Sequence, residues 1–149
     1  MKRSFVLGII VAVIIIIVTA YISTIKNNDS DSVKISFSGY VTNNIDGDTI
    51  EIEHQRIRLS LTSTPELNED GGIEAKEFTN YLCPMGSPAL VVVDGGQLQD
   101  KYGRTIAKVY CGGILLNSAL LDDGLAVVDT RFCSESEFAT EDWAKKFGC

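Results

Sequence analysis

The hydrophobic pattern of the chain begins with one long apolar run. Residues Phe5 to Val18 are apolar throughout, and weaker apolar character continues to Ile25. The run therefore spans about twenty residues, the length that a transmembrane helix needs. Lys2 and Arg3 precede it, which predicts a cytoplasmic N-terminus and places residues 27–149 outside the cytoplasmic membrane.

A cleavable signal peptide is the alternative interpretation of this run. Val18 to Ala20 forms a tolerable cleavage site, but apolar cores of signal peptides are usually about 7–15 residues long. We favour an uncleaved signal anchor over residues 1–25, with an extracytoplasmic domain behind it. Cleavage would instead give a secreted protein, and the sequence leaves both outcomes open.

The rest of the chain alternates between strand-like and helix-like patterns. A polar linker over residues 26–35 leads into a domain over residues 36–149. Alternation or short apolar runs predict strands at 33–45, 49–53, 56–59, 89–94 and 105–111, with a brief extended segment at 125–129. Helical spacing predicts helices at 73–83, 114–123 and 135–147, the last with Phe138, Trp143 and Phe147 on its inner face. This order predicts a mainly β fold, a small five-stranded β-barrel with about three helices.

The stretch from residue 46 to residue 66 concentrates the candidate chemistry. Residues 49–59 read as a hairpin with its turn at His54 and Gln55, so Asp48 and Arg58 are expected to lie close together. Carboxylate oxygens are hard ligands suited to Ca²⁺, and the planar fork of Arg matches phosphate oxygens. The combination indicates phosphodiester chemistry assisted by a divalent cation.

The charge balance restricts how the domain can bind nucleic acid. All 20 Asp and Glu residues follow the apolar run, against 11 Lys and Arg, which gives residues 26–149 a net charge of about −9. A domain this acidic lacks the broad basic footprint of general nucleic-acid-binding proteins. A phosphate site must therefore be local and consist of a few cationic side chains, with a metal ion expected beside them.

Four cysteines, at positions 83, 111, 133 and 149, lie beyond the apolar run. None of them has the Cys-x-x-Cys spacing of a zinc site. In an oxidising compartment disulfides are expected, and four cysteines allow three pairings, which the spacing alone leaves open.

A series of short motifs runs in order along residues 38–129. They are Asp-Gly-Asp-Thr at 46–49, Arg-Leu at 58–59, Thr-Pro-Glu at 64–66, Glu-Ala at 74–75, Asp-Lys-Tyr-Gly-Arg at 100–104, Leu-Asn at 116–117 and Gly-Leu-Ala at 124–126. Each is weak alone, but their order and spacing resemble the staphylococcal (thermonuclease-type) nuclease family. The resemblance implies an OB-type barrel of five strands with three helices. It also implies Ca²⁺-dependent hydrolysis of DNA, RNA or both to 3′-phosphate ends.

The resemblance assigns roles residue by residue. Asp48 is similar to the first carboxylate ligand of Ca²⁺, and Thr64 to the residue whose backbone carbonyl binds the ion. Glu66 resembles the carboxylate that activates the attacking water, and Arg58 and Arg104 resemble the pair that holds the reacting phosphate. Two further residues are similar to those that contact a neighbouring phosphate, Lys101 and Tyr102.

The chain departs from the family pattern at two positions. The family has a second Asp immediately before Thr-Pro-Glu, and this chain has Ser63, whose neutral hydroxyl is a weaker metal ligand. The active-site Tyr of the family, in the segment after Gly-Leu-Ala, aligns with Thr130. The first departure predicts weakened Ca²⁺ binding, and the second affects a substrate contact.

The family fold also implies a disulfide pairing. If the strands before and after residues 95–104 are antiparallel neighbours, as in the resembling fold, Cys83 and Cys111 meet at one end of the barrel. Cys133 and Cys149 then form the second bridge and tether the last helix.

Two other classes of function remain open. The domain fits an OB-type binding module that keeps its phosphate contacts but has lost turnover, or a surface-displayed interaction domain. Asp46-Gly47 by itself also fits an ordinary turn. The joint presence of Asp48, Arg58, Glu66 and Arg104 favours the nuclease, because a binding module needs no residue that activates water.

Overall fold

The structure is a computed structural model that describes residues 36–149. The predicted signal anchor and the predicted linker both fall outside these residues. No helix within residues 36–149 is long and apolar enough to span a membrane.

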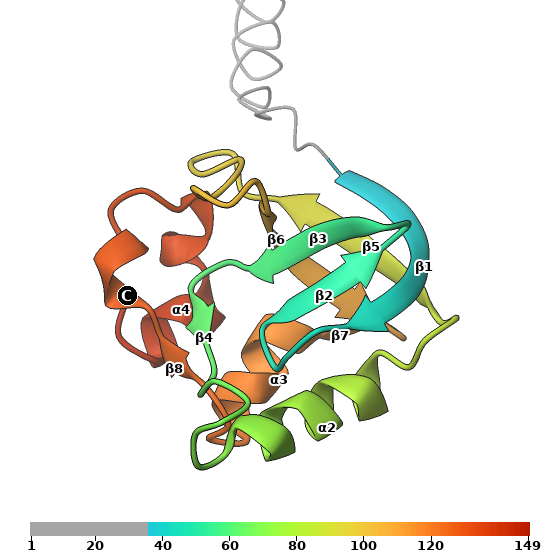
Figure 1. The fold of residues 1–149 in the computed structure, drawn as a ribbon. Coiled ribbons are helices and arrows are strands. Elements are labelled where there is room, and N and C mark those ends of the chain that lie inside the picture. The colour runs from blue at the N-terminus through green and yellow to red at the C-terminus, as the bar shows by residue number, and fades with distance from the viewer. Residues whose placement is uncertain (1–35) are drawn as a thin grey trace, which may run out of the picture. The chain divides into compact units, whose positions relative to one another are not determined.

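Five main strands in residues 36–149 form a closed barrel (Figure 1). They are β1 (Ser36–Asn44), β2 (Thr49–Ile52), β3 (Gln55–Leu59), β5 (Pro88–Val93) and β6 (Thr105–Cys111). Their order is β3-β2-β1-β5-β6 with antiparallel neighbours, and a parallel pairing of β3 with β6 closes the barrel. Short strands add to it: β7 (Ile114–Leu115) pairs with β6, and β4 (Thr62–Ser63) pairs with β8 (Val127–Val128). The predicted OB-type barrel is confirmed.

The hairpin of β2 and β3 brings the residues of the central stretch together. Thr49 pairs with Arg58, and Ile52 pairs with Gln55. The turn consists of Glu53 and His54, with φ of 50° and 62°, so the predicted turn at His54 and Gln55 is one residue too late. Two consecutive left-handed residues match the right-handed twist of a two-residue hairpin, which explains why the turn settles there.

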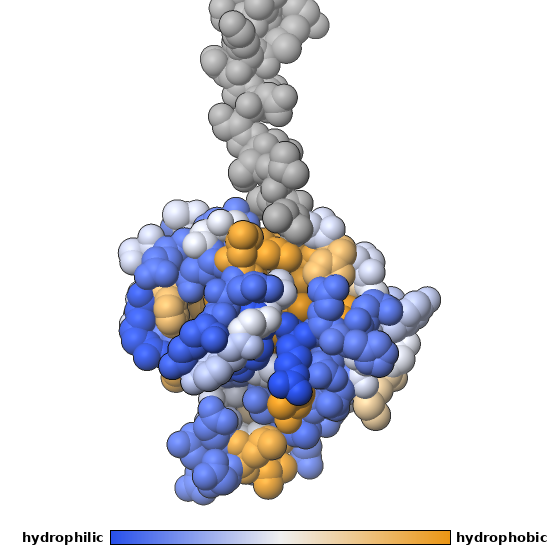
Figure 2. Space-filling model, turned by 45° about the horizontal axis from the view of Figure 1, so that its top comes forward, coloured by the Kyte–Doolittle hydropathy of each residue, from blue (hydrophilic) through white to orange (hydrophobic). Residues whose placement is uncertain are grey.

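The barrel core consists of aliphatic side chains from alternating strand positions. Ile50, Ile57, Val91 and Val109 are completely buried and belong to one hydrophobic cluster. Full burial of one such side chain stabilises the fold by about 1.5–3 kcal/mol. Most of the surface in Figure 2 is hydrophilic, with smaller hydrophobic areas between the polar residues.

Two helices cover one end of the barrel, α2 (Gly72–Leu82) and α3 (Leu116–Asp122) (Figure 1). The hydroxyl of Thr79 in α2 donates to the carbonyl oxygen of Gly47 at 2.7 Å. A Cβ atom at Gly47 would lie only 2.7 Å from the Cβ atom of Ala75. Glycine at this position therefore lets the turn at residues 46–48 pack directly against α2.

The predicted helix at 114–123 starts two residues too early. Ile114 and Leu115 form β7 instead, because Gly112 and Gly113 both adopt positive φ and return the chain onto β6.

The predicted single helix at 135–147 is wrong. The segment forms a 3₁₀ turn, η2 (Glu137–Thr140), and a short helix, α4 (Asp142–Lys146), separated by an extended Glu141 with ψ of 150°. The Glu141 carboxylate accepts hydrogen bonds from buried Lys108 of β6 at 2.6 and 2.8 Å. This tertiary ion pair anchors Glu141 to the barrel and interrupts the helical pattern.

All four cysteines of the chain are paired. Cys83 bonds to Cys111, and Cys133 bonds to Cys149, which is the pairing that the family resemblance implies. The first bridge lies in the buried core, and the second is partly exposed.

Candidate active site

Asp48 is a buried carboxylate immediately before β2. Its Oδ2 accepts a hydrogen bond from the backbone N–H of Thr64 at 2.8 Å, and its Oδ1 accepts one from the Thr49 hydroxyl at 3.2 Å. The Arg58 guanidinium forms an ion pair with the same carboxylate. The predicted proximity of Asp48 and Arg58 is therefore present, and Asp48 also holds the strand before Thr64-Pro65-Glu66 in place.

Arg58 lies between negative and positive neighbours. Its side chain is 22% exposed, and its Nη2 lies 3.4 Å from the Ser63 hydroxyl. Burial and the nearby charge of Arg104 lower the pKa of Arg58 from its ordinary value, while Asp46 and other carboxylates oppose that shift. Because the charge of Arg104 disfavours the cationic form of Arg58, an anion bound near both groups would be favoured.

Arg104 is fixed by two side chains. Its Nε donates to Asp100 Oδ2 at 2.7 Å, and its Nη1 donates to the Thr49 hydroxyl at 3.0 Å. Burial acts to raise the pKa of Asp100, but hydrogen bonds from the backbone and side chain of Arg104 and from Tyr102 lower it below its ordinary value overall. Asp100 thus stays ionised and keeps the guanidinium of Arg104 directed toward Thr49 and Arg58.

Glu66 stands in the exposed turn that precedes α2. Its backbone is held by a hydrogen bond from its N–H to Glu69 Oε2 at 2.9 Å. Within residues 36–149 no hydrogen bond or ion pair engages its carboxylate, which lies close enough to Arg58 to affect its pKa. A free carboxylate beside an anion-binding pair has the chemistry of a base that takes a proton from water.

A cleft of about 850 Å³ opens beside this cluster. Three segments line it: residues 58–62, from the end of β3 to the start of β4, the loop from Gly96 to Tyr102, and the segment from Asp129 to Glu135. Arg104 also lines the cleft, together with both residues predicted to contact a neighbouring phosphate, Lys101 and Tyr102. Tyr102 is 72% exposed and carries the Lys101 ammonium 4.9 Å from its ring centroid.

The metal-binding prediction rests on Asp48, Thr64 and Ser63. All of their candidate donor atoms are oxygens, the type that Ca²⁺ prefers. Asp48 is the only carboxylate among them, and both of its oxygens already have partners. In the described part of the chain no three acidic, His or Cys side chains group as a metal site. The donors fit Ca²⁺ in kind but supply a single negative charge.

The sequence interpretation missed the wall formed by the segment after β8. Thr130 does not line the cleft, whereas Asp129, Arg131 and Phe132 do. Arg131 binds Asp129 through two hydrogen bonds, at 2.8 and 2.7 Å. The comparison with the family pattern predicted a substrate contact in this segment only at Thr130, although the sequence has a charged residue on either side of it.

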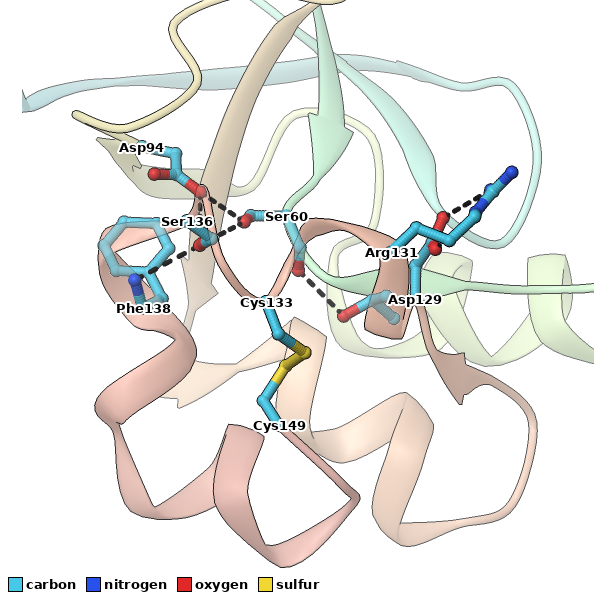
Figure 3. Close-up of a disulfide and its surroundings, with 9 residues drawn as sticks. Ser60, Asp94, Asp129, Arg131, Cys133, Ser136, Phe138 and Cys149 are labelled. Carbon is cyan, nitrogen blue, oxygen red and sulfur yellow. Dashed lines mark hydrogen bonds and ion pairs between the residues drawn. A yellow bond between two sulfur atoms is a disulfide. The ribbon is translucent and has the colours of Figure 1, made fainter.

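A buried carboxylate, Asp94, attaches this wall to the barrel. It accepts hydrogen bonds from the hydroxyls of Ser60 and Ser136, and from the backbone N–H groups of Gly96 and Glu137. Figure 3 shows Ser60, Asp94 and Ser136 pointing toward one another beside the Cys133–Cys149 disulfide. The only sequence signal for this cluster is an Asp that directly follows a buried strand.

Gly96 completes the attachment. A Cβ atom at this position would lie 1.8 Å from the backbone oxygen of Glu135, so only glycine lets the two cleft-lining loops pack this closely.

Comparison with known proteins identifies relatives of this chain. The family model described as staphylococcal nuclease homologue matches residues 56–146. Endonuclease YncB of Bacillus subtilis is 35% identical over 94 residues, covering 56% of this chain and 44% of that protein. The SPbeta prophage-derived endonuclease YokF of the same organism is 34% identical over 94 residues, covering 56% and 31%.

A plant relative extends the comparison. The probable staphylococcal-like nuclease CAN1 of rice (Oryza sativa subsp. japonica) is 30% identical over 103 residues, covering 69% of this chain and 29% of that protein. The aligned part is less than half the length of each of these three relatives. The barrel, the ordered motifs and the match over most of the domain agree: this chain belongs to the staphylococcal nuclease family.

Proposed function

We propose that residues 36–149 form a nuclease domain that hydrolyses phosphodiester bonds in DNA, RNA or both. One observation carries the proposal. Arg58 and Arg104 both line a cleft and lie near buried Asp48 and the free carboxylate of Glu66. The names of the relatives, two of them endonucleases, support the same activity class.

Each side chain of the site has its own role in the proposed reaction. Arg58 and Arg104 bind the phosphoryl oxygens and stabilise the charge that develops there, while Asp48 and Asp100 hold the two guanidinium groups in position. Glu66 takes a proton from the attacking water, whose oxygen forms the new bond to phosphorus. The bond from phosphorus to the 5′ oxygen breaks and that oxygen gains a proton, which leaves a 3′-phosphate and a 5′-hydroxyl.

Ca²⁺ is the proposed cofactor. The Asp48 carboxylate, the Thr64 backbone carbonyl and, more weakly, the Ser63 hydroxyl would hold it. Bound there, the ion would neutralise charge on the phosphoryl oxygens. Because affinity depends on the number of charged ligands, we propose weak binding in the millimolar range of extracellular modules.

An extracytoplasmic location agrees with weak calcium binding. Disulfides form and persist outside the reducing cytosol, and all four cysteines of this chain are paired. A membrane-anchored domain outside the cytoplasm would also meet abundant Ca²⁺ and extracellular nucleic acid.

The second candidate function is binding of nucleic acid without hydrolysis. It is favoured by Ser63, which brings no charge to the metal site, and by the ion pair that already engages Asp48. A binding module would retain affinity for oligonucleotides but release no 3′-phosphate ends.

A nuclease assay on the purified full-length chain distinguishes the two candidates. Labelled DNA and RNA are incubated with millimolar Ca²⁺ or with a chelator, and the product ends are identified. Ca²⁺-dependent release of 3′-phosphate ends supports the nuclease. Binding without cleavage in both conditions supports the binding module, and absence of both activities contradicts both proposals.

A further inference from the structure

The segment after β8 brings a cation and an aromatic ring into the cleft together. Arg131 and Phe132 belong to the short 3₁₀ turn η1 (Thr130–Phe132) and both line the cleft. The Arg131 guanidinium lies 5.5 Å from the centroid of the Phe132 ring, and the Arg131 side chain is 79% exposed. This pair stands on a different segment from Lys101 and Tyr102, which form a similar cation and aromatic pair.

The cleft collects positive charge from an otherwise acidic domain. Residues 36–149 contain nine Lys and Arg residues and 18 Asp and Glu residues. Four of those cations line or border the cleft, against three of the acids. Two of the three acids, Asp100 and Asp129, are themselves paired with Arg104 and Arg131. The lining of the cleft is therefore slightly positive within a domain that is strongly acidic, which favours binding of a polyanion there.

A phosphate can replace Asp129 as the partner of Arg131. The Arg131 side chain is 79% exposed whereas that of Asp129 is only 13% exposed, so the guanidinium is the partner that a phosphate can reach. Its two parallel N–H···O bonds show that the fork of Arg131 is presented for bidentate contact, the geometry that also binds phosphate oxygens. Phe132, 37% exposed, offers a ring face to a base.

We propose that Arg131 is a further phosphate-binding residue of the cleft. With Phe132 it binds a nucleotide that flanks the one held by Arg58 and Arg104, on a single-stranded substrate. Single strands are the substrate class because only unpaired bases expose their faces to side chains such as Tyr102 and Phe132. The inference rests on the proposed function, because it extends the same cleft.

A simpler role for Arg131 would be to neutralise Asp129, whose charge reaches Arg58. In that case Arg131 would act on the substrate only through Asp129, and removal of both charges together would restore binding. A direct phosphate contact predicts that the double variant Asp129→Asn/Arg131→Gln still binds with one contact fewer.

The test is a salt titration of oligonucleotide binding. The full-length chain carrying Glu66→Gln, in chelator so that the probe stays intact, binds a fluorescent oligothymidylate of about ten nucleotides. Arg131→Gln is compared with Arg56→Gln, which removes an exposed arginine that is also ion-paired but lies outside the cleft lining. Loss of one phosphate contact lowers the slope of log affinity against log salt by about 0.7 for single strands.

The proposal expects the reduced slope in Arg131→Gln and in the double variant, and the parental slope in Arg56→Gln and Arg131→Lys. Equal slopes in Arg131→Gln and its parent, or parental binding in the double variant, would overturn it while leaving the nuclease proposal intact. If the parent, Glu66→Gln, does not bind the oligonucleotide, this proposal is overturned. The nuclease proposal fails as well only if the wild-type chain also shows no cleavage in the nuclease assay.

Discussion

At the scale of single residues, the site depends on how Arg58 is held. Asp48 forms an ion pair with it, other carboxylates such as Asp46 attract it, and the nearby charge of Arg104 repels it. A phosphate that enters between the two arginines relieves the repulsion. This arrangement explains why the fold keeps two cations so close in an acidic domain.

The Glu66 carboxylate is the group expected to move the proton. Glu66→Gln keeps the shape of the side chain but removes the base, so turnover should fall by about 10²–10⁴-fold. Arg104→Gln should lower turnover by about 10²–10³-fold through lost charge stabilisation. Initial rates of cleavage measure both effects, and Glu77→Gln, an exposed position on α2, serves as the matched control. Unchanged rates in both site variants would rule out these assignments.

Ser63 is the residue that should set calcium affinity. Ser63→Asp adds a second charged ligand and should tighten Ca²⁺ binding by about tenfold, equivalent to about 1.4 kcal/mol. The half-activating Ca²⁺ concentration measures this, with the neutral Ser63→Asn as control. Arg58 lies 3.4 Å from Ser63. A new carboxylate that pairs with Arg58 instead would leave the calcium dependence unchanged and show that residue 63 does not serve the metal.

Asp129 should contribute to acid sensitivity. Hydrogen bonding from Arg131 lowers the pKa of Asp129, with burial opposing. A carboxyl group with a lowered folded-state pKa stabilises the fold above its unfolded pKa, about 3.9, and loses that contribution as pH falls through the folded value. Asp129→Asn should therefore lose less stability than wild type between pH 6 and pH 3 in urea unfolding. Asp123→Asn, an exposed position, should follow wild type.

At the scale of elements, the segment from Asp129 to Glu135 forms one wall of the cleft, and the chain that follows it to Cys149 contains no long helix. Its attachment consists of Asp94 with Ser136, the pair of Lys108 and Glu141, and the Cys133–Cys149 disulfide. Each of these three attachments joins residues that are far apart in the sequence. Removal of one of them should therefore loosen the wall while the barrel stays folded.

The Cys133–Cys149 bridge allows a direct test of that view. It joins residues 16 apart, so Cys133→Ser/Cys149→Ser should lower the free energy of unfolding by about 3 kcal/mol. Because the bridge adjoins the cleft wall, KM for oligonucleotides should also rise. Cys83→Ser/Cys111→Ser removes the core bridge instead and should destabilise the barrel without the same rise in KM. An equal effect of both pairs on KM would show that the wall has no special dependence on its bridge.

At the scale of the whole molecule, an acidic domain concentrates its nucleic-acid chemistry in one cleft. Its net negative charge repels polyanions at a distance, so association should depend on the local cations and on salt.

The predicted location is open to a direct measurement. Protease added to closed cells should degrade residues 36–149 if they lie outside the membrane, and non-reducing peptide mapping of the native protein should recover both disulfides. A cytosolic marker protein provides the control for cell integrity. Protection of the domain in intact cells, or four alkylatable thiols, would contradict the extracytoplasmic proposal.

The sequence by itself predicted the barrel and the proximity of Asp48 and Arg58, but not the cleft wall that contains Arg131 and Phe132. Alternating apolar positions specify strands because each strand must bury one face. A hairpin over residues 49–59 was enough to predict that Asp48 lies near Arg58, although the predicted turn was one residue too late. Where local pattern and tertiary contact agree, as in β6 and in α2, the predicted bounds differ from the observed ones by at most one residue.

Only the tertiary structure decided the C-terminal wall. Helical spacing over residues 135–147 is genuine, but Lys108 draws Glu141 onto the barrel and Asp94 draws in Ser136, so the helix breaks. The same contacts bring Arg131 and Phe132 into the cleft, more than 70 residues from Arg58 in sequence. The spacing of residues along the chain reflects only local backbone geometry. The positions of Arg131 and Phe132 depend instead on contacts between charged groups that form only after the barrel has closed.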